Sequence, residues 1–204
     1  MTEFPSETTG NPVAGYAANV ADLVGARSYS ADHETVRIYV DREDWVESIR
    51  KARDDGGLEF FSWLSAVDWS REVAVGDPVE DVGSLEERFE VMCRISSVET
   101  WEGAQFIAEV PKDDPVIDSL VPLFGGAEWH EREAAEMFGL VFTGHPNPKK
   151  LYLPDQFEGN PLRKSFALLA REVKPWPGTV DVEAMPDVPD ESEPGPPAAE
   201  EAGA

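Results

Sequence analysis

Hydrophobic and polar residues alternate along two neighbouring segments of the chain. In residues 88–95, Phe, Val, Cys and Ile side chains share one side, and residues 104–110 repeat the pattern with Ala, Phe, Ala and Val. A period of two predicts strands with one buried face. The residues between the segments include a glycine and several polar side chains, which indicates an antiparallel hairpin.

Earlier in the chain, the pattern predicts a strand, a helix and a second strand. Residues 36–40 alternate, and the helix that follows should begin after an N-capping Asp41 and end at two glycines. Its hydrophobic stripe consists of Trp45, Val46, Ile49 and Ala52. Residues 58–67 are almost continuously hydrophobic, which is typical of a strand covered on both faces. A short helix is expected at residues 15–26.

Two helices are expected after the hairpin, at residues 114–124 and 127–138. The elements together predict an α+β fold, with a mixed or antiparallel sheet of about four to five strands and helices packed on it. The periodicity ends at residue 140, and prolines recur from there on. An extended, irregular C-terminal arm should therefore follow the domain.

The chain divides into four parts on this basis. We expect a flexible N-terminus at residues 1–13, the α+β domain at residues 14–139, an extended docking arm at residues 140–177 and a disordered, acidic, proline-rich tail at residues 178–204. Within the domain, residues 72–87 indicate an acidic surface loop.

The charge of the chain is strongly negative, since 17 Lys and Arg against 41 Asp and Glu give −24. Such a surface repels nucleic acid and anionic lipid. Residues 145–174 differ, because six Lys or Arg and three Asp or Glu give +3. This basic stretch lacks the periodicity for a core of its own, so we expect it to lie on the surface of another protein. The alternative is that it folds back on its own domain.

Motifs for cofactor chemistry are absent from the sequence. Cys93 is the only cysteine, which is too few for an iron–sulfur cluster, and its place in a predicted strand indicates a buried, inert thiol. No glycine-rich phosphate loop, GxSxG nucleophile elbow, signal peptide or hydrophobic run of about 20 residues is found. We therefore expect no catalytic residue, bound cofactor, metal ion or membrane span in this chain.

The helix predicted at residues 127–138 carries the densest set of charged side chains. Three recur every four residues and place an arginine between two carboxylates: Glu128, Arg132 and Glu136. Four residues are of types that bind metal ions, His130, Glu131, Glu133 and His145, and a hydrolase would use His130, Glu133 and His145. A stand-alone metal hydrolase is therefore an alternative, although the paired helical histidines of a zinc helix are missing. A free adaptor that works through its acidic tail is a further alternative.

The same region carries four motifs: Glu-Arg-Glu at 131–133, Glu-Met-Phe-Gly at 136–139, Gly-His-Pro at 144–146 and Pro-Leu-Arg-Lys at 161–164. In order and spacing they resemble the 30-kDa subunit family, which is the C subunit of the bacterial proton-translocating NADH:quinone oxidoreductase. The resemblance implies these subunit-interface residues: Glu131, Arg132, Glu133, Glu136, Phe138, Gly139, Gly144, His145, Pro146, Lys149, Gly159, Pro161, Leu162, Arg163 and Lys164. Glu136 departs from the family pattern, which has Asp there.

The resemblance implies a non-catalytic subunit in the peripheral arm of that complex, on the cytoplasmic side of the cell membrane. The complex transfers electrons from NADH through FMN and iron–sulfur centres to quinone and couples this to proton translocation. The resemblance puts those cofactors in partner subunits and makes the D subunit of the complex the chief partner. Arg132 and Arg163 would form the strongest contacts, because a guanidinium can hold a carboxylate with two hydrogen bonds. The equivalent subunit of a membrane-bound hydrogenase-type complex is the near alternative.

Overall fold

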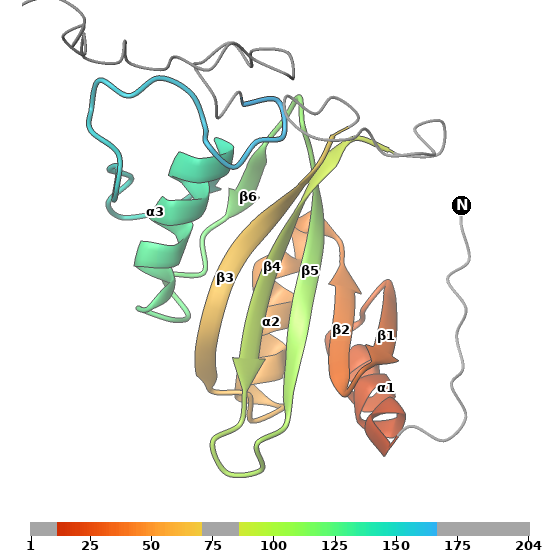
Figure 1. The fold of residues 1–204 in the computed structure, drawn as a ribbon. Helices are drawn as coiled ribbons and strands as arrows, with labels where there is room; N and C mark the ends of the chain where they lie inside the picture. The colour runs from red at the N-terminus through yellow and green to blue at the C-terminus, as the bar shows by residue number, and fades with distance from the viewer. Residues whose placement is uncertain (1–11, 71–85, 167–204) are drawn as a thin grey trace, which may run out of the picture. The chain divides into compact units, whose positions relative to one another are not determined.

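The computed structural model describes residues 12–70 and 86–166. Its elements, in chain order, are α1 (Pro12–Val24), β1 (Ser28–Asp32), β2 (Thr35–Val40), a 3-10 turn (Arg42–Asp44), α2 (Trp45–Asp54), β3 (Phe60–Trp69), β4 (Arg88–Ser96), β5 (Gly103–Pro111), β6 (Val116–Asp118), α3 (Ala127–Phe138) and β7 (Val141–Thr143) (Figure 1).

Five strands form one mixed sheet in the order β1-β2-β5-β4-β3 (Figure 1). The β2–β5 pair is parallel, and the other three pairs are antiparallel. The predicted hairpin is present, since β4 and β5 pair from Arg88 opposite Pro111 to Ser96 opposite Gly103. Short strands β6 and β7 form a separate parallel pair. The α+β fold with a mixed sheet is therefore confirmed.

The core lies between one face of the sheet and the helices. Alternate residues of β4 and β5, such as Cys93 and Phe106, are fully buried on this face. Helix α1 packs on β1, β2 and α2, and α3 packs on β3. The rings of Phe89 in β4 and Phe138 in α3 meet edge to face, 6.4 Å between centroids. This packing fixes α3 against the sheet and leaves its C-terminal end at the start of the arm.

The pattern missed β1, which pairs with β2 through a two-residue turn. His33 and Glu34 form the turn with φ of 50° and 59°. Such turns usually carry glycine or asparagine, so the sequence held no turn signal. The expectation for residues 58–67 was also wrong in part. From Leu64 to Trp69 the residues of β3 are alternately buried and half-buried, so only one face of the strand is fully covered.

Residues 114–124 do not form the predicted helix. They form β6 and a turn, and the Ser119 amide donates to the carbonyl of Thr143, just beyond the β6–β7 pair. Pairing with a strand distant in sequence has overridden a local helix start. Asp41 precedes the 3-10 turn, but its side chain makes no capping hydrogen bond.

Several expectations fall on other parts of the chain. Most of the predicted N-terminus (1–11) and of the acidic loop (71–85) lies outside the described residues. The end of the arm and the whole acidic tail, 167–204, lie outside them as well. Pro12 and Val13, expected in the N-terminus, are the first residues of α1.

Candidate functional site

The arm closes over the C-terminal end of α3. The last carbonyls of a helix have no partner within the helix and need one elsewhere. Here Asn160 Nδ2 donates to the carbonyl of Glu136 at 2.9 Å, and the amide of Leu162 donates to that of Met137 at 3.1 Å. Arg163 Nε donates to the carbonyl of Phe138 at 2.5 Å. We call this contact between residues 160–163 and the end of α3 the arm clamp.

Gly139 makes the arm clamp possible. It ends α3 with φ of 75°, in the left-handed region that favours glycine, and its amide donates to the Ala135 carbonyl at 2.8 Å. A Cβ here would collide with the guanidinium of Arg163 and come within 2.8 Å of the Asn160 side-chain oxygen. Two separate parts of the motif, residues 136–139 and 160–163, are thus brought together by hydrogen bonds to the last carbonyls of α3.

The Glu136 carboxylate holds a second part of the arm. Its two oxygens accept hydrogen bonds from three consecutive amides, those of Leu151 and Tyr152 at 2.9 Å and of Leu153 at 2.5 Å. Burial acts to raise the pKa of Glu136, but the three amides outweigh it and hold the pKa below its ordinary value. The carboxylate is therefore ionised at neutral pH and fixes residues 151–153 on the helix.

Two cations of this region bind backbone carbonyls of the arm. Arg132 donates from Nε to the carbonyl of Lys149 at 2.7 Å and from Nη2 to that of Lys150 at 3.0 Å. Lys150 Nζ in turn donates to three carbonyls, those of Pro154, Asp155 and Phe157. Arg132 lies 4.0 Å from the Glu128 carboxylate, whereas Glu136 binds amides instead. The predicted placement of Arg132 between two carboxylates is wrong for Glu136.

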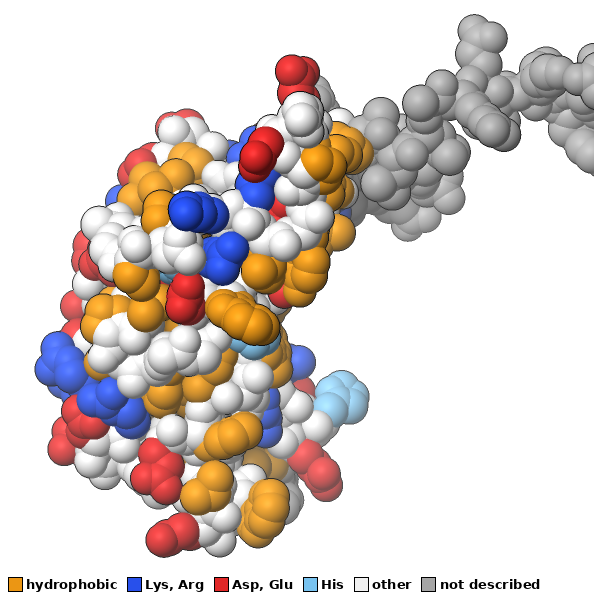
Figure 2. All heavy atoms as spheres, turned by 90° about the vertical axis from the view of Figure 1, so that its left-hand side faces the viewer, with side chains coloured by type: hydrophobic (Ala, Val, Ile, Leu, Met, Phe, Trp, Pro, Cys, Tyr) orange, Lys and Arg blue, Asp and Glu red, His pale blue; other side chains and the backbone are white. Residues whose placement is uncertain are grey.

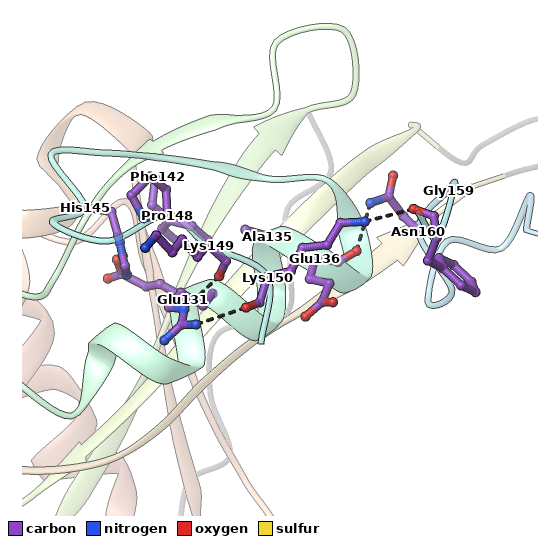
Figure 3. Close-up of a pocket in the computed structure, with 12 residues that line it drawn as sticks. Glu131, Ala135, Glu136, Phe142, His145, Pro148, Lys149, Lys150, Gly159 and Asn160 are labelled. Atoms are coloured by element: carbon purple, nitrogen blue, oxygen red, sulfur yellow. Dashed lines mark hydrogen bonds between the residues drawn. The ribbon is translucent and has the colours of Figure 1, made fainter. Parts of the chain in front are cut away.

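A pocket of about 330 Å³ lies between α3 and the arm (Figure 3). Its lining comes from α3, β7 and the arm, and Figure 3 shows the side chain of Asn160 close to Glu136, whose carbonyl it binds. The lining residues include Glu131, Arg132, Glu136, His145, Lys149 and Gly159. Six residues that the motif singled out thus surround one cavity. Arg132 and Glu136 hydrogen-bond to the backbone of residues 149–153, so the pocket takes its shape from the way the arm folds over α3.

Similarity to known proteins identifies the family. The family model described as "Respiratory-chain NADH dehydrogenase, 30 Kd subunit" matches residues 38–172. This chain belongs to that family. The C subunit of NADH-quinone oxidoreductase from Rhodopseudomonas palustris (strain TIE-1) is 31% identical over 170 residues, which cover 82% of this chain and 74% of that protein. The C subunit from Roseiflexus sp. (strain RS-1) is 33% identical over 153 residues, 74% of this chain and 79% of that protein.

A solved structure shares the fold of this 30-kDa-subunit chain. It is one chain of the membrane-bound sulfane sulfur reductase, an archaeal respiratory membrane complex. The TM-score is 0.62 and the sequence identity is 19%, and the match covers 76% of this chain and 86% of the matched chain. At this identity the likeness shows the fold alone. The resemblance drawn from the motifs of residues 131–164 is confirmed by the family match and the two bacterial relatives.

Glu131 of the family motif is buried inside the domain. It has no exposed surface, and its oxygens accept from Ser119 Oγ and from the amide of Leu120, both at 2.6 Å. Burial raises the pKa of Glu131, and the two hydrogen bonds only partly oppose this. Glu131 therefore holds the turn after β6 against α3. No alternation or spacing in the sequence pointed to this partner.

Asp68 joins the arm to the sheet in this 30-kDa-subunit chain. At the end of β3 its carboxylate accepts the amide of Lys164 at 2.9 Å and the hydroxyl of Ser70 at 2.9 Å, and it lies 2.6 Å from Lys112 Nζ. Burial acts to raise its pKa, but these three partners outweigh it and lower the pKa. Asp68 is absent from the predicted interface residues, since only the fold brings residue 164 back to β3.

The two histidines of α3 and the arm serve different contacts. His130 Nδ1 lies 3.2 Å from the carbonyl of Leu64, and its ring meets Phe61 edge on. His145 Nδ1 accepts the amide of Asn147 at 3.0 Å, so Nε2 carries the hydrogen that faces the Glu128 carbonyl at 3.0 Å. Across residues 12–70 and 86–166, no three His, Cys, Asp or Glu side chains gather where they could hold a metal ion. The structure therefore does not bring His130, Glu133 and His145, the residues of the hydrolase alternative, together as a metal site.

The remaining motif residues line or support the arm. Gly144 and Gly159 have φ of 81° and 96°, and a Cβ on Gly159 would collide with the ring of Phe166. Glu133 is half-buried, Pro161 begins the turn of the arm clamp, and Pro146 and Leu162 are exposed. In the described part of this 30-kDa-subunit chain, every helix falls short of what crossing a bilayer requires.

Proposed function

We propose that this chain is a non-catalytic subunit of the peripheral arm of NADH:quinone oxidoreductase, where it docks chiefly on the D subunit. Membership of the 30 kDa subunit family supports a place in that complex. Docking through the motif residues of α3 and the arm is our own inference. It rests on how charge and hydrophobic surface are distributed over the described residues.

The basic side chains of the arm carry the proposal. Away from the arm, Arg27 before β1 and Arg88 in β4 each form an ion pair with Glu109, at 2.8 and 2.9 Å. In contrast, Lys149, Arg163 and Lys164 form no ion pair with any carboxylate of the described residues. Lys164 Nζ lies 5.5 Å from the centroid of the Trp69 ring instead. In a chain of net charge −24, positive groups without acidic partners favour contact with an acidic surface on another subunit.

Hydrophobic side chains are exposed on the same part of the molecule. Among the described residues, large hydrophobic side chains that are more than half exposed on α3, β7 and the arm are Trp129, Val141, Tyr152 and Leu162. Lys and Arg side chains are interspersed with hydrophobic ones on this face (Figure 2). Exposed hydrophobic surface edged by charge is typical of a protein interface. The partner surface that fits is hydrophobic with acidic groups at its rim.

In this proposal the chain positions its neighbours and carries no electrons. FMN and the iron–sulfur centres lie in partner subunits, which pass electrons from NADH to quinone while protons are translocated. The chain would sit on the cytoplasmic side of the membrane without crossing it. Arg132 and Arg163 remain proposed contacts with the D subunit. Because both already bind carbonyls of this chain, their first role is to shape the docking surface.

Charge reversal at Lys149 tests the docking surface without touching the arm clamp. Lys149→Glu replaces an exposed ammonium by a carboxylate, while the Lys149 carbonyl still accepts from Arg132. We expect recovery of the chain together with the D subunit from gently solubilised membranes to fall roughly threefold to tenfold. NADH:quinone turnover should fall in parallel, and the melting temperature of the isolated chain should stay unchanged.

Lys51→Glu is the matched control. It makes the same charge change in the last turn of α2, which leads into β3 at the end of the sheet opposite the arm (Figure 1). If Lys149→Glu assembles like the wild type, or if both variants lose assembly equally, the arm is not the docking surface. If the wild-type chain co-purifies with hydrogenase subunits, the membrane-bound hydrogenase alternative replaces the proposal. Deleting residues 178–204 tests the adaptor alternative, because an adaptor that works through the tail requires it for assembly.

A further inference from the structure

The loop between β4 and β5 carries an exposed tryptophan at its tip. Trp101 is 86% exposed and has φ of 63°. The loop lies at one end of the long strands, and the arm lies at the other (Figure 1). Trp101 is therefore outside the docking surface proposed above.

The backbone of this loop is held by its own hydrogen bonds. Ser97 N donates to the carbonyl of Glu102 at 2.8 Å, and Trp101 N donates to the carbonyl of Ser97 at 3.2 Å. Ser97 Oγ also accepts from the amides of Glu99 and Thr100, at 3.3 and 3.4 Å. The left-handed conformation at position 101 is thus a requirement of the loop, whatever side chain stands there.

Tryptophan is a poor choice for that position within this chain. A left-handed backbone favours glycine, with asparagine or aspartate next, and a bulky side chain there costs free energy. The Trp101 side chain recovers little of this cost, because most of its surface stays in water. Strained positions are more frequent at functional sites than elsewhere, and Trp101, unlike His33 and Glu34 in the β1–β2 turn, spends this strain on a large exposed side chain. Tryptophan is also one of the residue types, with tyrosine and arginine, that are enriched among the residues that dominate binding at protein interfaces.

The surroundings of Trp101 are hydrophobic and acidic. Phe60 is 52% exposed and pairs with Ser96 next to the loop, and Val98 is 50% exposed within it. A cavity of about 300 Å³ lies at the base of the loop. Three exposed acids line it: Glu59, Glu99 and Glu102. The patch thus combines an aromatic anchor, a hollow and negative charge.

We propose that Trp101 anchors a second interface, with a neighbouring subunit that offers a hydrophobic slot edged by Lys or Arg. A second copy of this chain would set the same three acids against one another, and anionic lipid or nucleic acid would be repelled in the same way. A basic protein surface is the partner that the charges fit. The inference rests on the proposed function only in that the neighbour belongs to the same complex.

Competition between two tagged chains tests the anchor. Wild-type chain and Trp101→Gly are expressed together, and their ratio is measured by mass spectrometry in the purified complex. Glycine suits the left-handed backbone, so the melting temperature of the isolated variant should equal or exceed that of the wild type. In the complex we expect the variant to be under-represented about tenfold or more. Tyr29→Ser, which removes an exposed aromatic side chain from β1, is the control and should compete equally.

Thiol labelling gives a second readout of the same surface. Cys93 is fully buried, so Thr100→Cys adds a single accessible thiol beside Trp101. Maleimide should label it at least about tenfold more slowly in the complex than in the isolated chain. Equal competition by Trp101→Gly, or equal labelling rates, overturns the second interface and leaves the proposed function intact. If wild-type chain co-purifies with no other subunit, the proposed function and this inference both fail.

Discussion

The guanidinium of Arg163 occupies the space that a side chain on residue 139 would need. Gly139 ends α3 in the left-handed conformation, and Arg163 packs against it while Nε donates to the Phe138 carbonyl. The guanidinium also lies 5.4 Å from the centroid of the Phe89 ring. A glycine in one motif and an arginine in another, 24 residues later in the sequence, are therefore the two halves of one contact.

Gly139→Ala should destabilise the chain more than its backbone conformation alone explains. The left-handed φ costs about 1–2 kcal/mol for any side chain. The collision with Arg163 and Asn160 would add to this by forcing the arm clamp open. We expect a total loss of about 3 kcal/mol in the free energy of unfolding, measured by urea denaturation.

Gly144→Ala is the matched control for this prediction. Gly144 has φ of 81°, close to that of Gly139, yet a Cβ there would meet no atom within 4 Å. Its substitution should cost only the conformational part, about 1–2 kcal/mol. Equal losses for the two variants would show that the side chains of Arg163 and Asn160 move away from a Cβ at residue 139 without cost to stability.

Four strands of the sheet could be predicted from the sequence because the signal of each is local, but their order could not, since the parallel pairing of β2 with β5 is not local. Alternation in residues 88–95 and 104–110 placed β4 and β5, which are neighbours in the chain and pair with each other. Strands β1 and β6 were missed for two different reasons. The first depends on a turn without glycine, and the second depends on pairing with β7, which lies more than 20 residues away.

The candidate site could be predicted as a set of residues but not as a geometry. The motifs named Glu136 and Arg132, and charge spacing suggested that they pair with each other. In the structure both bind the backbone of the arm instead. Every residue has a backbone amide or carbonyl, so the residue types do not show which of these groups a side chain will bind. The three amides at Glu136 and the two carbonyls at Arg132 therefore could not be predicted from the spacing of charged residues. The same holds for Asp68, whose partner Lys164 is 96 residues away.

Replacing Glu136 should release the middle of the arm. Glu136→Gln leaves one oxygen for the three amides of residues 151–153 and removes the charge that strengthens their bonds. We expect a loss of about 2 kcal/mol and faster hydrogen exchange at the amides of Leu151, Tyr152 and Leu153. Glu133→Gln, on the same helix, is the control and should leave these amides protected. Unchanged exchange in Glu136→Gln would contradict the assignment.

The pH dependence of the Glu136 effect has a definite sign. The pKa of Glu136 is lowered on folding, so its carboxylate stabilises the fold above the unfolded pKa of about 4.5. This contribution is lost as the pH falls through the folded pKa. The difference in unfolding free energy between wild type and Glu136→Gln should therefore shrink as the pH is lowered from 5 to about 3.

Glu131 should show the opposite slope, because burial raises its pKa above 4.5. Protonated Glu131 is favoured in the folded chain, so this residue makes stability fall as the pH rises from about 4.5 through the folded pKa. Glu131→Gln removes the titration but leaves one buried donor, Ser119 or Leu120, with a poorer partner. The variant should be about 1–3 kcal/mol less stable than the wild type at pH 4.5. That deficit should narrow towards pH 8, as the wild type bears the cost of a buried charge. Urea denaturation at several pH values measures the unfolding free energies of the wild type and of Glu131→Gln. If the difference between them widens as the pH rises, ionised Glu131 stabilises the turn after β6.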